Sequence, residues 1–486
     1  NCIVYYVDHY NEELKNWNQE VDYTSETTAN RVANQVDGLI EEWAEKLSIK
    51  NYRGPILISK GYPYLMIVGG DEIIPFYRYD DPTNSEENWK LANGINYEIL
   101  KSYDRGYFLT DNPYGDIMGD DWEHGKLEIG VGRIIGASVQ DMSSLIKNGC
   151  SIKIPRGIAV IASSHNWDLG TKWGWGNHFN IPEGLREKGF DVKNDYEDPS
   201  TIDNDAWREK TLRDVINLGP DILMIGGHAD HDSVDLAHGL LRVDEIDEYY
   251  DDNDQISGSN PLIYFGGCHA GCPVPFPDGG LDKNLVYELC THDISGYIGS
   301  TGFAADIGTV SYRLTGDAES FAQIFFKEFT NSTTQSLAVG DALKKAKVNY
   351  NPFFNWDAED SKTVTEYILY GVPWFKIKYP RGSISSTSAA DYMKKSNKIP
   401  PNNISITISN PIAIGSNTFK RIIEVNISGY QLYEEDGYDI LIINGTSLAF
   451  DVLKPVLPIV TVRLRLPLNA YVEKLICLDN NSSIIG

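Results

Sequence analysis

The sequence predicts an α/β fold whose parallel strands are covered by helices, followed by a small all-β domain. Three observations support this. Short apolar segments alternate with helical patterns over residues 1–382. Several of these segments end in glycine pairs, and alternating strand patterns replace helical ones after residue 403. Near-continuous apolar strands separated by helices are typical of a parallel sheet covered on both faces.

The first predicted part spans residues 1–150. It begins with the strand-like CIVYYV and continues with an amphipathic helix near residues 30–46 and the strand YLMIVGG. Residues 81–126 are rich in Asp, Asn, Gly and Tyr and have little periodicity, so we expect long surface loops there. The strand LEIGVGRI and a helix from about Ser138 complete this N-terminal α/β subdomain.

The second predicted part, residues 151–382, is a further α/β subdomain. Its strand candidates are residues 157–163, 221–227, 261–267 and 296–301, with helical stretches such as AQIFFKEF between and after them. Ligands of such sheets bind beyond the carboxyl ends of the strands. We expect a linker at residues 383–403 and a separate immunoglobulin-like β-sandwich at residues 404–486, where segments such as ISITIS and DILIIN alternate.

The composition of this 486-residue chain indicates which classes of partner it favours. The formal net charge of −27 disfavours nucleic acid and favours cationic partners, although an acidic surface can also serve solubility alone. No apolar run approaches the roughly 20 residues of a membrane span. The six scattered cysteines do not form the dense framework of a small disulfide-rich domain. The chain opens with Asn1 and lacks a basic-then-apolar leader, so we expect a processed, secreted or cell-surface protein, and a monomer.

Two predicted strands of the second part end in the same way, and each leads into a candidate reactive residue. DILMIGG leads into His228, and PLIYFGG leads into Cys268. The glycines before them, Gly227 and Gly267, allow a substrate backbone to approach closely. If the two strands are neighbours, the thiol and the imidazole face one cleft.

A thiol and an imidazole are the minimum set for acyl transfer. The thiolate attacks, and the imidazole accepts the thiol proton and returns it to the leaving amine. The backbone N–H groups of Ala229 and Cys268 are candidate donors to the oxyanion. Taken singly, each residue has a simpler interpretation: Cys268 as a core thiol and His228 as a loop histidine.

At these residues the chain resembles the gingipain-like cysteine peptidases of the caspase and legumain superfamily. The resemblance covers about residues 1–380 and rests on YLMIVGGDEIIPF, LEIGVGRI, the two blocks above, GYIGSTG and YGVPWFKI. It implies a caspase-like sheet in two α/β subunits, followed by an immunoglobulin-like domain. It also implies a cysteine endopeptidase with Cys268 as nucleophile and His228 as general acid/base.

The resemblance implies two further roles near these residues. The His-Gly pair of the family is here His228-Ala229, and alanine can serve because the oxyanion contact is a backbone N–H. The family places an acidic residue five positions before the Arg of its Gly-Arg pair, where it orients the histidine. That position is Glu128, ahead of Arg133. Glu128 could equally be a surface carboxylate.

Gingipain-like enzymes cut after Arg or Lys by means of an acid in the primary specificity pocket. Asp306 and Asp141 are the candidates for this substrate-binding role, although an Asp in a first helical turn, as Asp141 is, also stabilises a helix without any substrate. No cofactor is expected for catalysis. The family also implies structural Ca²⁺, for which the loops 80–82, 119–121 and 251–254 are rich in oxygen, although none has EF-hand spacing.

Two alternatives remain at this point. The run His228-Ala-Asp230-His231-Asp232 is similar to part of the zinc-binding loop of metallo-β-lactamases, in which a metal generates hydroxide, although Gly226 stands where that motif has its first histidine. The other alternative is an inactive peptidase-like adhesin. The presence of both Cys268 and His228 argues against it.

Overall fold

The chain forms two compact units, Asn1–Ile399 and Pro400–Gly486. The computed structural model describes most of the first unit and eight short strands of the second. The described residues of the first unit are 4–10, 12–17, 25–47, 64–83, 102–103, 105–119, 121–150, 155–163, 180–195, 219–236, 239–243, 260–273, 284–304, 317–350 and 356–380.

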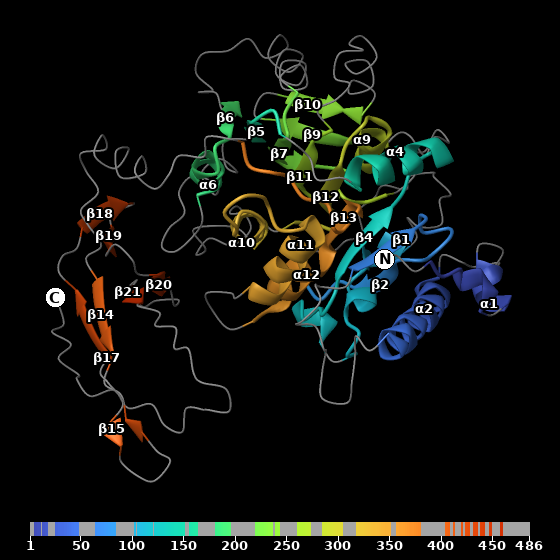
Figure 1. Cartoon of the computed structure of the whole chain (residues 1–486), viewed down its shortest axis with the longest axis horizontal. Helices are drawn as coiled ribbons and strands as arrows, with labels where there is room; N and C mark the ends of the chain where they lie inside the picture. The colour runs from blue at the N-terminus through green and yellow to red at the C-terminus, as the bar shows by residue number, and fades with distance from the viewer. Residues whose placement is uncertain are drawn as a thin grey trace. The chain divides into compact units, whose positions relative to one another are not determined.

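The centre of the first unit is an eight-stranded sheet with the order β1-β4-β13-β12-β11-β7-β5-β6 (Figure 1). Its strands, in this order, are Tyr64–Val68, Gly130–Ile134, Tyr367–Gly371, Gly296–Ser300, Leu262–Gly266, Ile222–Gly226, Ile158–Ser163 and Asp191–Asp195. Every neighbouring pair is parallel except β12 and β13. The predicted α/β class with a mostly parallel sheet is confirmed.

The two predicted α/β parts contribute to one sheet. β1 and β4 come from residues 1–150, and β4 is joined through β13 to the strands of the second part. A two-stranded sheet is marginally stable alone, whereas addition to a larger sheet pairs its edge. The strand direction reverses between β12 and β13, so the amino end of β4 and the carboxyl ends of β7 and β11 lie at the same edge.

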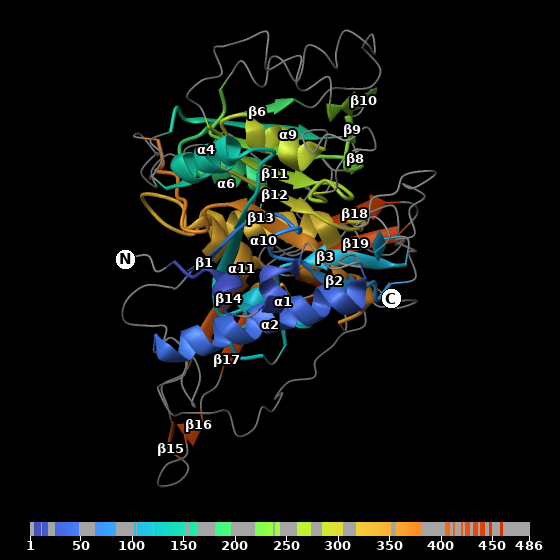
Figure 2. The ribbon, with the colours of Figure 1, turned by 90° about the vertical axis from the view of Figure 1, so that its right-hand side faces the viewer.

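Helices cover both faces of this sheet. On one face α4 (Val139–Gly149) lies beside α9 (Leu285–Thr291), as Figures 1 and 2 both show. Among the described residues, the helices on the other face are α6 (Ile181–Glu187), α10 (Asp317–Phe329), α11 (Val339–Asn349) and α12 (Ala358–Glu366). Side chains along β11 alternate accordingly. Ile263 and Phe265 face the first layer, and Leu262 and Tyr264 face the second.

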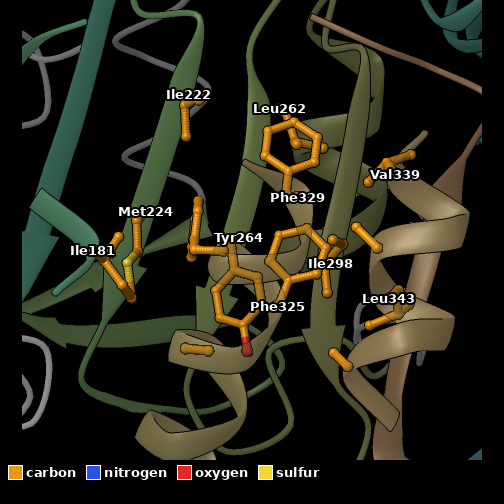
Figure 3. Close-up of a cluster of buried hydrophobic side chains, with 14 of the residues drawn as sticks. Ile181, Ile222, Met224, Leu262, Tyr264, Ile298, Phe325, Phe329, Val339 and Leu343 are labelled. Carbon is orange, nitrogen blue, oxygen red and sulfur yellow. The ribbon is translucent and has the colours of Figure 1, made fainter. Parts of the chain in front are cut away.

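The second layer is rich in aromatic side chains. Tyr264 stacks on Phe325 with ring centroids 5.3 Å apart and on Tyr367 at 5.9 Å, and Figure 3 shows Tyr264 among the aliphatic side chains of the neighbouring strands. Each large apolar side chain buried in this way contributes about 1.5–3 kcal/mol. This packing fixes β11, the strand that precedes Cys268.

The N-terminal helices pack near the β1 side of the sheet. α2 (Glu26–Lys46) begins where the Ser25 hydroxyl accepts a hydrogen bond from the Thr28 N–H. Its apolar positions recur at helical spacing, with Val32, Val36 and Ile40 buried, and they form a third core with residues of β1 and of α1 (Glu12–Lys15).

Smaller elements complete the described part of this unit. β2 (Tyr77–Asp80) pairs with β3 (Tyr107–Thr110), and β8 (His228–Ala229), β9 (Ser233–Leu236) and β10 (Gly239–Arg242) form a three-stranded sheet. Three short 3-10 helices are η1 (Val7–His9), η4 (Pro113–Gly115) and η5 (Trp122–His124). The prediction of surface loops over residues 81–126 is therefore wrong in part, because β3 lies there and Tyr103 and Phe108 are buried.

The second unit is all β where it is described. Antiparallel pairing joins β14 (Ile404–Ile408) with β17 (Ile423–Ile427), and β18 (Gln431–Glu435) with β19 (Tyr438–Ile442). The same holds for β15 (Ile412–Ala413) with β16 (Phe419–Lys420), and for β20 (Ser447–Ala449) with β21 (Leu457–Ile459). The immunoglobulin-like arrangement stays a prediction. Among the described residues, no helix combines the length and the apolar character needed to cross a membrane.

Candidate active site

Cys268 and His228 occupy matching positions beyond two neighbouring strands. β7 and β11 are parallel and adjacent, and Gly226 stands opposite Gly266 in their register (Figure 1). His228 and Cys268 each lie two residues further along the chain. Neighbouring strands are about 4.8 Å apart, so the two residues emerge at the same point of the sheet edge.

The segments that carry these two residues are in direct contact. A Cβ atom at Gly267 would lie 2.6 Å from Ala229 Cβ and 2.7 Å from the Gly227 carbonyl oxygen. Only a glycine permits this approach, because real Cβ atoms do not come so close to other atoms. The glycine pair before Cys268 therefore packs the thiol segment against the imidazole segment.

The two side chains differ in exposure. Cys268 is half-buried, packs against the aromatic layer and lies with Sγ 3.6 Å from the Ala304 carbonyl oxygen, to which it donates. His228 is exposed and belongs to β8, where it is paired with Asp235 of β9. The exposure of both side chains would allow them to meet a peptide from solvent.

Backbone hydrogen bonds fix the turn that follows Cys268, residues 268–272, here termed the nucleophile turn. The His269 N–H donates to the Gly302 carbonyl at 2.8 Å, and the Gly271 N–H donates to the Ser300 carbonyl at 2.6 Å. Within the turn, the Cys272 N–H donates to the His269 carbonyl at 2.8 Å. The end of β12 thus anchors the turn. The contacts of His269 and Gly271 with residues 300–302 could not be predicted from the sequence, because they depend on the strand order.

The other described cysteines sit in different environments. Cys272 and Cys290 are buried, and burial is the main cause that raises the pKa of the Cys290 thiol. A buried thiol that resists ionisation is a poor nucleophile. Cys150 is exposed, but it follows α4, which begins beyond the carboxyl end of β4 at the opposite edge of the sheet from Cys268.

Glu128 lies at the same sheet edge but on a more distant strand. It precedes β4, and its Oε2 accepts a hydrogen bond from the Met118 N–H at 3.2 Å. Three strands separate β4 from β7 in the sheet order, which corresponds to roughly 19 Å between strand axes. Orientation of His228 by Glu128 stays a prediction that the strand order does not favour.

The two candidate specificity aspartates have different outcomes. Asp141 lies beyond the carboxyl end of β4, at the edge opposite Cys268. Its Oδ2 accepts hydrogen bonds from the N–H and the hydroxyl of Ser138, each at 2.7 Å, in a capping box that begins α4. Its carboxylate therefore serves the helix. Asp306 lies outside the described residues.

One group of described side chains has the composition of a metal site. Ligand atoms of Asp230, His231 and Asp232 lie within 4.8 Å of one another in the turn between β8 and β9. The group does not include His228, and His231 Nδ1 is hydrogen-bonded to Asp230 Oδ1. The zinc alternative requires His228 together with Asp230 and His231, and the structure does not include His228 in such a group.

The predicted calcium loops carry carboxylates that already have cationic partners. Asp81 accepts from the buried Lys362 ammonium at 2.8 Å, and Asp121 forms an ion pair with Lys126 and a hydrogen bond with His124. Such oxygens would have to exchange these partners for an ion. Residues 251–254 lie outside the described residues.

The described geometry defines an α/β protein in which a cysteine and a histidine follow two adjacent strands at one edge of the central sheet. The sequence model of peptidase family C25 matches residues 9–378, most of the chain. The chain therefore belongs to peptidase family C25, the gingipain family of cysteine peptidases.

Solved structures similar to the chain include two gingipain structures and a caspase. The crystal structure of the Arg-specific cysteine proteinase gingipain R has 14% identity and a TM-score of 0.47, with 88% of this chain and 90% of that chain covered. The complex of the Porphyromonas gingivalis RgpB pro- and mature domains has 14% identity and a TM-score of 0.46, with 88% and 92% covered. Caspase-1 from Spodoptera frugiperda has 14% identity and a TM-score of 0.31, with 46% and 92% covered. No curated protein matches the chain.

Proposed function

We propose that this chain is a secreted or cell-surface, monomeric endopeptidase that cleaves peptide bonds after Arg or Lys, with Cys268 as nucleophile and His228 as general acid/base. The observation that carries the proposal is the register of β7 and β11, which sets Gly226 opposite Gly266 and brings the two following segments into contact. Membership of peptidase family C25 supports it independently.

The proposed reaction has two halves. His228 accepts the thiol proton as Cys268 Sγ forms a bond to the scissile carbonyl carbon, and the backbone N–H groups of Ala229 and Cys268 donate to the oxyanion. Collapse breaks the C–N bond, and His228 gives its proton to the leaving amine. A water, deprotonated by His228, then hydrolyses the thioester and releases the acid and the thiol.

The preference for a basic residue before the cleaved bond has separate support. The net charge of −27 attracts cationic chains, and a carboxylate in the primary pocket would bind guanidinium or ammonium through charge-assisted hydrogen bonds. Asp306 is the proposed carboxylate, because it lies two residues after Ala304, whose carbonyl accepts from Cys268. Asp141 is left out because it caps α4.

The test is cleavage of a mixed peptide library by the wild type and by Cys268→Ala. Wild type should cut after Arg or Lys, and Cys268→Ala should cut nothing while its circular dichroism and urea midpoint stay close to those of the wild type. Turnover by Cys268→Ala would refute the nucleophile. Asp306→Asn should weaken the basic preference, and an unchanged preference would assign that role to another residue.

A further inference from the structure

Three buried tyrosine hydroxyls surround the nucleophile turn. Tyr297 of β12 donates to the Ala270 carbonyl at 2.5 Å, and Tyr370 of β13 donates to the Gly271 carbonyl at 2.6 Å. The third, Tyr103, comes from the N-terminal part of the chain. These three side chains have no exposed surface.

Tyr103 joins two segments that border the thiol. Its hydroxyl donates to the Thr301 carbonyl at 2.8 Å and accepts from Cys272 Sγ at 3.2 Å. Cys272 ends the nucleophile turn, and Thr301 directly precedes Gly302, whose carbonyl binds the His269 N–H. The Tyr103 hydroxyl therefore links the end of the nucleophile turn to residues 301–302, which hold the beginning of that turn.

The residue after Cys268 has an uncommon backbone conformation. His269 has φ of +51°, in the left-handed region that a non-glycine residue enters at a cost of about 1–2 kcal/mol. Its imidazole is fully buried, with its centroid 5.8 Å from that of Tyr103 and 4.5 Å from that of Phe303, both edge to face. The rings hold this side chain in the core while the preceding residue, Cys268, remains half-buried.

We propose that Tyr103 and His269 are positioning residues for the nucleophile. Tyr103 holds His269 in its left-handed conformation through its ring and ties the nucleophile turn to residue 301 through its hydroxyl, so that the thiol points toward the peptide in one orientation. The inference rests on the proposed function in one respect, the identity of Cys268 as nucleophile. Small displacements of a reacting group cost much: about 1 Å can lower a rate on the order of 100-fold.

If Tyr103 had only a structural role, loss of its hydroxyl would lower stability without a specific effect on catalysis. A second buried tyrosine provides the comparison. Tyr114 is also fully buried and donates its hydroxyl to the Pro75 carbonyl at 2.5 Å, but it belongs to the core beside α2. Tyr103→Phe and Tyr114→Phe each remove a buried hydroxyl and keep the ring. We expect similar drops in urea midpoint for the two variants.

Only Tyr103→Phe should change catalysis. We expect its kcat to fall roughly tenfold or more with KM within about twofold of wild type, because orientation rather than substrate binding is lost. Tyr114→Phe should retain the wild-type kcat. Equal kcat values for the two tyrosine variants would overturn the inference.

Substitutions at position 269 test the backbone part of the inference. Asn tolerates the left-handed region, glycine enters it freely, and β-branched valine is strongly disfavoured there. We expect kcat to decrease in the order wild type, His269→Asn, His269→Gly, His269→Val, since glycine keeps the conformation but loses the ring contacts. A His269→Asn variant as inactive as His269→Val would show that the imidazole itself is required and would contradict the conformational role. If His269→Val does not fold, the asparagine and glycine variants still decide.

Alkylation of Cys268 by iodoacetamide gives a readout that does not require turnover. Its rate, followed by mass spectrometry of the peptide that contains Cys268, should differ at least threefold between Tyr103→Phe and wild type and be unchanged in Tyr114→Phe. If the wild type cleaves no peptide, the proposed function fails, yet this comparison still supports or rejects the positioning of the thiol. Equal alkylation rates in the three proteins would reject it.

Discussion

Arg133 and Asp111 form a bidentate ion pair inside the first unit. Nε and Nη2 of Arg133 donate to the two carboxylate oxygens of Asp111 at 2.9 and 2.6 Å, while Nη1 donates to the Gly69 and Ile74 carbonyls. The guanidinium also lies 3.8 Å from the ring centroid of Phe76. This arginine of the family motif therefore ties β4 to the segments after β1 and β3.

Removal of one partner of this pair should destabilise the fold strongly. Arg133→Met leaves the Asp111 carboxylate buried without its main cation, and about 3–5 kcal/mol of unfolding free energy should be lost in urea denaturation. The double variant Arg133→Met/Asp111→Leu should lose less than the sum of the two single variants. Lys46→Met, which breaks the exposed Lys46–Glu42 pair, is the control and should have no measurable effect. A loss in Arg133→Met as small as in this control would contradict the argument.

The buried Lys347 makes stability depend on pH. Its Nζ donates to the Tyr367 carbonyl at 2.7 Å, and burial lowers its pKa to about 7, although Asp111 and Glu366 favour the charged form. Between about pH 7 and the ordinary value of 10.5 the unfolded chain holds a proton here that the folded chain has released. Stability from this group therefore increases as the pH increases through that window.

Lys347→Met should remove this part of the pH dependence. The difference in urea midpoint between wild type and variant should change steadily from pH 7 to pH 10, in favour of wild type at the higher pH. Lys147→Met, at an exposed position of α4, is the control and should give a constant difference. Parallel curves for wild type and Lys347→Met would show that Lys347 is charged in the folded protein throughout.

Gly267→Ala should separate the thiol segment from the imidazole segment. The added methyl group would overlap Ala229 Cβ and the Gly227 oxygen, so we expect a loss of about 1–3 kcal/mol in stability. We also expect kcat to fall more than tenfold, because the thiol and the imidazole must share a proton. Gly38→Ala, in α2 where a Cβ meets nothing within 4 Å, should instead stabilise the fold by about 0.5–1 kcal/mol. Full activity of Gly267→Ala would refute the importance of this contact.

Glu128→Gln tests the orienting role implied by the family resemblance. The distance between β4 and β7 leads us to expect a kcat within about threefold of wild type, against a loss of about 100-fold or more for His228→Ala. Single-turnover kinetics on a basic peptide would measure both. A loss in Glu128→Gln close to that in His228→Ala would establish the carboxylate as part of the catalytic group.

Inhibitors distinguish thiol from metal chemistry. Iodoacetamide should abolish peptide cleavage, and the zinc chelator 1,10-phenanthroline should leave it intact, because the group Asp230, His231 and Asp232 does not include His228. Loss of activity with the chelator, restored by added zinc and not by calcium, would favour the zinc alternative. Loss restored by calcium alone would indicate a structural ion.

Much of the sheet could be predicted from the sequence, because most of its strands are short and apolar and three of them, β1, β7 and β11, lead into glycine pairs. The segment 261–267 predicted as a strand contains β11, Leu262–Gly266, and the glycine pairs after β7 and β11 mark one edge of the sheet. The sequence could not predict that β13 joins β4 to β12, since a single bridge, Tyr370 to Arg133, makes the connection. Because the pairing of β13 with β4 was not predicted, residues 1–150 and 151–382 were expected to form two α/β parts, whereas their strands form one sheet.

Cys268 and His228 could be proposed as reactive residues from the sequence, whereas the residues around them could not be predicted. Cys268 and His228 stand out because they follow strands along the chain. Tyr103 gave no signal, because its contacts with Thr301 and Cys272 join residues that are far apart in sequence. Asp141 was ambiguous for the opposite reason: a capping carboxylate and a specificity carboxylate look alike until the edge of the sheet is known.

The tyrosines around the nucleophile turn come from distant parts of the chain. Tyr103 emerges early in synthesis and Tyr370 late, and both touch the same few residues between them in the chain. A ribosome-bound chain that has not yet released Tyr370 therefore lacks part of the scaffold of its own thiol. Because synthesis begins at the amino end, the residues that contact the nucleophile turn are not all available until nearly the whole first unit has been made.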